Sequence, residues 1–151
     1  MLLMVTPERA AEYREDVRSV AAWADSRRDI AGVAVVGSWA RNEPLMDSDL
    51  DLVVLTTDAQ QYLSSSSWPP EALGQNAEVV RRREWGPLTE YRVVLHFGFE
   101  IEFGFVAPDW ARTEPLDGGT ARVVRDGCVP LHDPAGVFER LIAAARVTAC
   151  R

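Results

Sequence analysis

Two apolar runs joined by a short polar loop constrain this chain more than any other part of its sequence. The runs are 33–36 and 50–55, and the loop between them reads Gly-Ser-Trp-Ala-Arg-Asn-Glu-Pro-Leu-Met-Asp-Ser-Asp. Nearly continuous Val, Leu and Ala runs of this length are typical of strands that are buried on both faces. Such strands need cover on both sides of a sheet, so the stretch favours an α/β or α+β fold.

Acidic residues cluster where the second apolar run begins. Asp49 and Asp51 are two positions apart, so in an extended strand their side chains lie on the same face. Two neighbouring carboxylates at the mouth of a buried strand repel each other, and they stay ionised at low cost only beside a cation or a basic group. The pair therefore indicates a metal site. Asp47 and Ser48 are typical of a turn that orients it.

Two other interpretations of the acidic cluster fit the sequence less well. A calcium-binding loop that starts at Asp47 requires glycine at its sixth position, which is Leu52 here. A phosphohydrolase of the haloacid dehalogenase type has its nucleophilic aspartate after a hydrophobic strand. In this chain the apolar run follows the aspartates instead.

The remaining sequence predicts one domain over residues 1–151, with an α/β (α+β) fold in which a mixed sheet is flanked by helices. Hydrophobic periodicity and capping residues predict helices at 7–28, 38–42, 58–63, 117–125 and from 133 onward. They predict strands at 30–36, 50–55, 78–85, 91–97, 99–106 and 129–131. The Ser- and Pro-rich segment 64–70 predicts a mobile loop, in which Trp68 is a candidate contact for a second substrate. The basic run 81–83 is interpreted as a solvated strand edge.

The predicted strand 99–106 carries a candidate third acid. Its apolar side chains alternate with Glu100 and Glu102, which therefore share one face. Glu102 is the preferred candidate, because its neighbours Ile101 and Phe103 are apolar and Gly104 leaves space beside it. Glu100 remains the alternative. Three carboxylates around divalent cations can stabilise both the attacking and the leaving oxygen of an in-line displacement.

Gly-Ser-x-Ala-Arg at 37–41, Ser-Asp-Leu-Asp-Leu at 48–52 and an acid on a later strand together resemble a known family. This is the DNA polymerase β-type nucleotidyltransferase superfamily, in particular its small members and the antibiotic nucleotidyltransferases. The resemblance implies the polymerase β-like nucleotidyltransferase fold. It also implies Mg²⁺-dependent transfer of a nucleoside monophosphate from a nucleoside triphosphate (NTP) to a hydroxyl of a small molecule or a protein, with release of pyrophosphate.

The same resemblance implies roles for individual residues. Gly37 and Ser38 would bind the triphosphate, with Arg41 as a further contact to its charge. Asp49 and Asp51 would ligate Mg²⁺, with two ions expected, and Glu102 would be the third ligand or the general base. Small members often have glycine after the Ala-Arg pair, where this chain has Asn42. The sequence therefore predicts a stiffer loop here.

Charge and composition limit the classes of partner that this chain is expected to bind. Sixteen Lys and Arg against 23 Asp and Glu give a net charge of −7, which argues against an extended nucleic-acid acceptor. A small phosphate ligand that arrives with divalent cations remains compatible. The sequence shows no signal peptide, no membrane span and no metal-type spacing of Cys128 and Cys150, so a cytoplasmic protein is expected. The acceptor pocket is expected to form either from the Trp68 region and C-terminal elements, or with a second protomer or a protein partner that completes it.

A second hypothesis belongs to a different functional class. On the same scaffold, the chain would be a regulatory or antitoxin-like binding protein with a helical protein partner. The complete set of three acids favours the enzyme, because a binding module gains nothing from carboxylates that repel each other.

Overall fold

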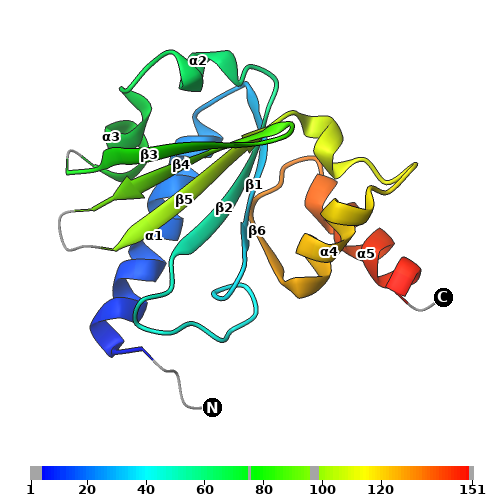
Figure 1. The fold of residues 1–151 in the computed structure, drawn as a ribbon, viewed down its shortest axis with the longest axis horizontal. Helices are drawn as coiled ribbons and strands as arrows, with labels where there is room; N and C mark the ends of the chain where they lie inside the picture. Colours follow the sequence, from blue (N-terminus) through cyan, green and yellow to red (C-terminus); the bar gives the residue numbers. More distant parts are fainter. Residues whose placement is uncertain (1–4, 75, 96–98, 150–151) are drawn as a thin grey trace.

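A mixed sheet forms the centre of the computed structural model, which describes residues 5–74, 76–95 and 99–149 (Figure 1). The elements in chain order are α1 (Pro7–Asp25), β1 (Ile30–Val36), β2 (Leu50–Thr56), α2 (Gln60–Leu63), α3 (Trp68–Leu73), β3 (Glu78–Trp85), β4 (Leu88–Val94), β5 (Glu100–Val106), the 3-10 helix η1 (Pro108–Ala111), α4 (Gly118–Asp126), β6 (Cys128–His132) and α5 (Val137–Ala149). No helix within these described ranges is long and apolar enough to cross a membrane. The predicted mixed sheet with flanking helices is confirmed.

The sheet order places distant parts of the sequence side by side. The strands lie in the order β3-β4-β5-β2-β1-β6, and β2 pairs with β5 in parallel while the other neighbouring pairs are antiparallel. Parallel neighbours begin at the same edge of a sheet. The starts of β2 and β5, each with its acidic residues, therefore lie next to each other.

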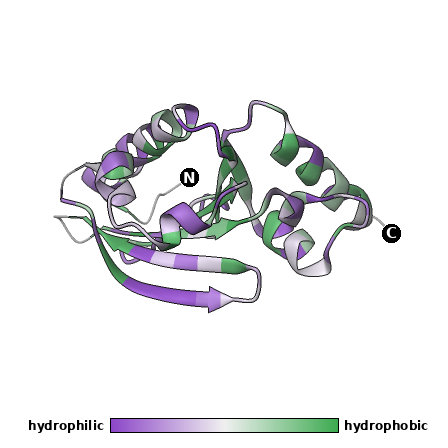
Figure 2. Cartoon of the chain, turned by 90° about the horizontal axis from the view of Figure 1, so that it is seen from above, coloured by the Kyte–Doolittle hydropathy of each residue, from purple (hydrophilic) through white to green (hydrophobic). Residues whose placement is uncertain are grey.

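Each face of the sheet carries its own hydrophobic core. On one face, α1 and α3 cover alternate strand residues such as Leu52 and Val54. On the other face, α4 and α5 contact β1 and β6 and bury Val53 and Leu55. The helices at opposite sides of the sheet are visible in Figure 1, and Figure 2 shows that the outer β3–β4 hairpin is largely hydrophilic. Burial on both faces explains the continuous apolar run of β2.

Several predicted elements have different bounds in the structure. Helix α1 begins after the Thr6 cap, as predicted, but it ends at Asp25 rather than 28. Strand β4 starts three residues before the predicted 91 and ends at Val94, and 96–98 lie outside the described residues. Strand β6 is longer by one residue at each end than the predicted 129–131. Cys128 has a free thiol, whereas Cys150 lies outside the described residues.

The predicted loop at 64–70 is confirmed for 64–67, but it is wrong for 68–70, where α3 begins, and the mobility of the segment stays a prediction. Trp68 is the first residue of α3, and Pro69 and Pro70 follow in the first turn, where proline is tolerated because its missing N–H has no helical partner. The Trp68 side chain is only 3% exposed, and its Nε1 donates to the carbonyl of Tyr62 at 3.2 Å. Aromatic rings of Trp23, Phe103 and Phe105 surround it. Trp68 is therefore a core residue and cannot contact a substrate.

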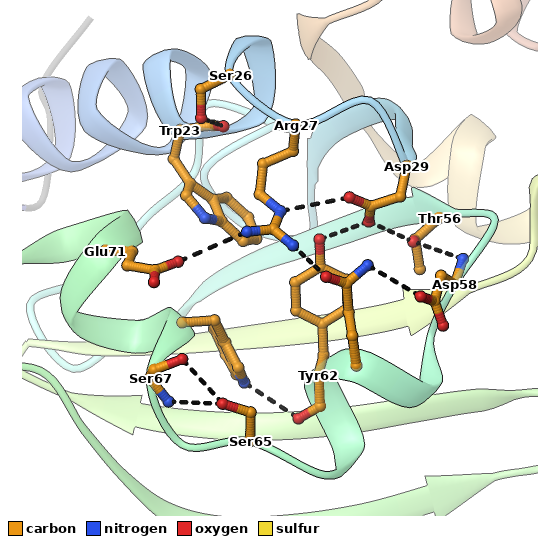
Figure 3. Close-up of polar contacts among 12 residues, drawn as sticks. Trp23, Ser26, Arg27, Asp29, Thr56, Asp58, Tyr62, Ser65, Ser67 and Glu71 are labelled. Carbon is orange, nitrogen blue, oxygen red and sulfur yellow. Dashed lines mark hydrogen bonds and ion pairs between the residues drawn. The ribbon is translucent and has the colours of Figure 1, made fainter.

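A polar cluster around Asp29 connects β1, β2 and α2 at the edge of the sheet away from the acids (Figure 3). Asp29 accepts hydrogen bonds from the hydroxyls of Tyr62 at 2.5 Å and Thr56 at 2.8 Å, and it pairs with Arg27 at 3.3 Å. Burial opposes ionisation of Asp29. The two hydrogen bonds and the Arg27 charge outweigh it, so the pKa of Asp29 lies below its usual value. The cluster holds the short helix α2 against the sheet.

Tyr62→Phe is expected to lower the free energy of unfolding by about 1–2 kcal/mol at pH 7, because Asp29 loses a buried donor. A depressed carboxyl pKa contributes stability above the unfolded-state pKa, about 3.9, and that stability is lost as the pH falls through the folded value. The difference between variant and native protein should therefore shrink below about pH 4. Urea unfolding of both proteins between pH 7 and below about pH 4 measures this difference in the free energy of unfolding. Tyr91→Phe is the control, because no hydrogen bond of its hydroxyl is found in the described part of the chain.

Candidate active site

The acidic residues converge at the shared edge of β2 and β5. Asp51 and Glu102 are direct neighbours in the parallel register, and Asp49 lies immediately before β2. Burial is the main reason that the pKa of Asp51 lies well above its usual range, and the adjacent Glu102 carboxyl raises it further. Burial also raises the pKa of Asp49, although the Arg92 charge opposes this. Carboxylates in this arrangement bind cations favourably, since a cation removes their mutual repulsion.

The position of Glu102 distinguishes it from Glu100. Glu102 lies opposite Asp51, and its side chain is 15% exposed. Glu100 lies two residues earlier, at the start of β5, and its side chain is 37% exposed. Both share the face of the sheet that carries Asp51, as the alternation predicted. The geometry brings Asp51 and Glu102 together, with Glu100 at the periphery.

A tight turn after β1 lies beside the acids. Gly37 has a left-handed φ of +76°, and the N–H of Arg41 donates to its carbonyl at 3.0 Å. The N–H groups of Ser38, Trp39 and Ala40 donate to no backbone carbonyl within the described residues. Successive N–H groups in such a turn form a concave anion-binding site. Trp39 fixes the turn from behind, because its ring stacks on Tyr13 of α1 at 4.3 Å.

Segment 38–42 is a turn rather than the predicted short helix. Asn42 has a φ of +62°, which ends the helical conformation before a second turn can form. Asparagine tolerates the left-handed region better than most residues with a side chain. Asn42 thus adopts a left-handed conformation that glycine, the residue often found here in the resembling motif, also allows.

Gly37→Ala is expected to destabilise the fold and reduce activity, because a Cβ at this position would lie 2.5 Å from Oδ2 of Asp51. The left-handed backbone alone costs about 1–2 kcal/mol for alanine. Gly74→Ala is a matched control, since Gly74 also has a positive φ but nothing lies within 4 Å of its added Cβ and it does not line the cleft near the acids. Urea unfolding should show a loss for both variants. Only Gly37→Ala should also lower an activity that depends on Asp51, by more than about tenfold, because only it moves an acid of the site.

The structure places Arg41 away from the acids. Its Nη1 lies 2.6 Å from Oδ2 of Asp126, at the end of α4, and its Nε lies 3.8 Å from Glu43. Asp126 and Glu43 are therefore the counter-charges of Arg41 in the structure. Its predicted role in binding the triphosphate stays a prediction.

A cleft of about 840 Å³ opens in front of the acids. Its residues come from the sheet face, the β3–β4 hairpin, η1 and α4. They include Asp51, Glu90, Glu102, Trp85, Trp110 and Val123. Trp85 is 54% exposed, so its ring is available to a ligand. The two tryptophans come from different elements, one from the hairpin and one from η1, and each provides a surface on which a planar group can stack.

Sequence reasoning missed two basic residues of the site. Arg92 of β4 pairs with Asp49 at 3.1 Å and also with Glu100 and Glu102, and Arg81 of β3 lies 3.3 Å from Glu102. Arg81 is therefore not only part of a solvated edge. The alternation of Glu90 and Arg92 along β4 was a visible signal of a polar face. That this face adjoins the acids depends on the pairing of β4 with β5, which the sequence does not reveal.

The donor set fits divalent cations such as Mg²⁺. Carboxylate oxygens are the ligands that such hard cations prefer. The missing Cβ of Gly37 leaves room at Oδ2 of Asp51. Among the described residues, no three acidic, His or Cys side chains are arranged to hold a metal ion. Arg92 contacts both Asp49 and Glu102, so a basic group lies where the sequence predicted either a cation or a basic group.

The sheet, the glycine turn and the paired acids define a nucleotidyltransferase-type domain. The family model described as "Nucleotidyltransferase domain" matches residues 17–113, and the chain belongs to this family. The matched range contains the glycine turn, Asp49, Asp51 and Glu102. The resemblance to the polymerase β-type superfamily is confirmed.

Solved structures with the same fold include those of a poly(U) polymerase and of an RNA terminal U-transferase. Cid1 in complex with the UTP analogue UMPNPP has a TM-score of 0.50 at 20% identity, covering 68% of this chain and 32% of that one. A cytoplasmic RNA terminal U-transferase has a TM-score of 0.51 at 19% identity, covering 68% and 31%. The Cid1 poly(U) polymerase with Mg 3′-dATP bound has a TM-score of 0.52 at 17% identity, covering 68% and 33%.

These likenesses concern the fold. The match spans about a third of the length of each of these proteins. A search of the curated proteins found no significant match.

Proposed function

We propose that this chain is a Mg²⁺-dependent nucleotidyltransferase that moves a nucleoside monophosphate from an NTP to a hydroxyl of a small molecule or a protein. The observation that carries the proposal is the parallel register that sets Asp51 beside Glu102, next to Asp49 and the Gly37 turn. Membership of the nucleotidyltransferase domain family supports it. The net charge of −7 favours a compact acceptor over a long nucleic acid.

Different residues of the site have different roles in the proposed reaction. The N–H groups of Ser38, Trp39 and Ala40 bind phosphate oxygens of the NTP. Asp49, Asp51 and Glu102 would hold the divalent cations. When bound, these would neutralise charge on the phosphates and make the acceptor hydroxyl more acidic.

The bonds change at the α-phosphorus. The acceptor oxygen forms a bond to it, the bond from it to the oxygen that bridges to the β-phosphorus breaks, and pyrophosphate leaves. The acceptor proton passes to the Glu102 carboxylate, which lies beside Asp51 and faces the cleft. The cleft between the hairpin and α4 takes the acceptor.

A transfer assay tests the proposal. The chain is incubated with Mg²⁺ and each α-labelled NTP, against small hydroxylated compounds, proteins and the chain itself. Label on an acceptor together with released pyrophosphate supports the proposal. If no NTP raises the melting temperature in the presence of Mg²⁺, the proposal is wrong, because a bound substrate must stabilise the native state.

A further inference from the structure

Among the described residues, Arg92 makes the most ion pairs with the acids of the site. It comes from β4, where its Cα pairs in register with that of Glu102 on β5. One terminal nitrogen, Nη2, contacts both Asp49 and Glu102, and the other, Nη1, contacts Glu100. The Arg92 side chain is about four-fifths buried. A single guanidinium thus joins three carboxylates from two segments.

These ion pairs are too enclosed to be incidental surface contacts. Exposed pairs contribute little, because water and salt screen them. Here the carboxylates lie close together, and Arg92 is their main counter-charge, with Arg81 adding a second contact to Glu102. Removing one partner of such a cluster leaves like charges with less compensation.

The hydrogen bonding of Arg92 is nevertheless incomplete. Its Nε is buried and has no hydrogen-bond partner among the described residues. A buried donor without an acceptor has an energetic cost. The Arg92 guanidinium is therefore held to the acids through its two terminal nitrogens alone.

We propose that Arg92 is a positioning residue that acts as an internal counter-cation, holding Asp49 and Glu102 together until divalent cations replace it. The proposal rests on the proposed function, because it assumes that these acids bind metal. Nη2 of Arg92 lies against Oδ2 of Asp49 and Oε1 of Glu102, so a cation held between these two acids would have to displace it. Arg92 therefore stabilises the metal-free protein and competes with the metal.

Arg92→Gln tests the proposal with Mn²⁺ alone, so that no acceptor has to be known. The variant should melt at a lower temperature than the native chain without metal, because the acids lose their counter-charge. It should bind Mn²⁺ about 5- to 10-fold more tightly, the size of an ordinary coupling between two binding events. Calorimetric titration gives the affinity, and thermal melts with and without Mn²⁺ give the stability.

Three controls separate the possible outcomes. Arg82→Gln removes the same charge from an exposed residue paired with Glu84, and it should leave Mn²⁺ affinity unchanged. Arg92→Lys keeps a positive charge and should recover much of the metal-free stability. Asp51→Asn should abolish Mn²⁺ binding.

The two proposals fail in different ways. If Arg92→Gln binds Mn²⁺ as tightly as the native chain or more weakly, Arg92 is not a competitor and this inference is wrong, while the proposed function stands. If the native chain binds no Mn²⁺, or binds it as Asp51→Asn does, the metal site of the proposed function is wrong as well.

Discussion

Asp51→Asn is expected to lower nucleotide transfer by about 10²–10³-fold or more, because removing one preorganised charge contact in an active site has an effect of this size. The fold should survive. The pKa of Asp51 lies above its unfolded value, so its ionisation destabilises the metal-free protein increasingly as the pH rises from about 4 toward the folded value. Asparagine has no such charge, and the variant should equal or exceed the native stability at pH 8.

Transfer assays and thermal melts at pH 5 and pH 8 measure both effects. Asp58→Asn is the matched control, because it removes the same charge from an exposed residue just beyond the far end of β2. It should change neither transfer nor melting by a large amount. Activity retained in Asp51→Asn would show that the site lies elsewhere.

Trp68→Ala is expected to produce the largest loss of stability, about 3–5 kcal/mol, since it removes a large buried aromatic side chain and leaves a cavity. Trp68 contacts rings from α1, α2 and the two strands β4 and β5, so the change affects both the α3 helix and the sheet. Urea or thermal unfolding measures the loss.

Trp85→Ala gives the comparison for this effect. Trp85 is more than half exposed, and its removal should cost no more than about 0.5 kcal/mol, as for other surface substitutions. If Trp85 contacts the acceptor, the same variant raises the KM for the acceptor. Equal stability losses in the two variants would contradict the position of Trp68 in the core.

The sequence predicted the parts of the fold that local patterns specify. Three strands were correctly predicted, at 33–36, 50–55 and 99–106. A strand that is buried on both faces leaves a continuous apolar run, and a strand that is buried on one face leaves an alternating pattern. The capping residues Thr6 and Asp117 marked the starts of α1 and α4.

The sequence did not reveal what depends on contacts between distant segments. More than forty residues separate Asp51 from Glu102, and their adjacency follows from strand order rather than from any local pattern. The same holds for Arg92, whose partners lie on other strands. Trp68 was misplaced because its short helix has too few residues to show a period, and its Ser and Pro composition is typical of loops.

The parallel pairing of β2 and β5 fixes the positions of the acids, whereas the β3–β4 hairpin shapes the cleft beside them. Between β2 and β5 the chain forms α2, α3 and the β3–β4 hairpin, which extends the same sheet beyond β5. The tip of the β3–β4 hairpin, around Gly86 and Pro87, forms one wall of the cleft. Lengthening or shortening that tip would reshape the space for an acceptor while the acids keep their register. The hairpin tip is therefore the natural place to engineer a change of acceptor in this domain.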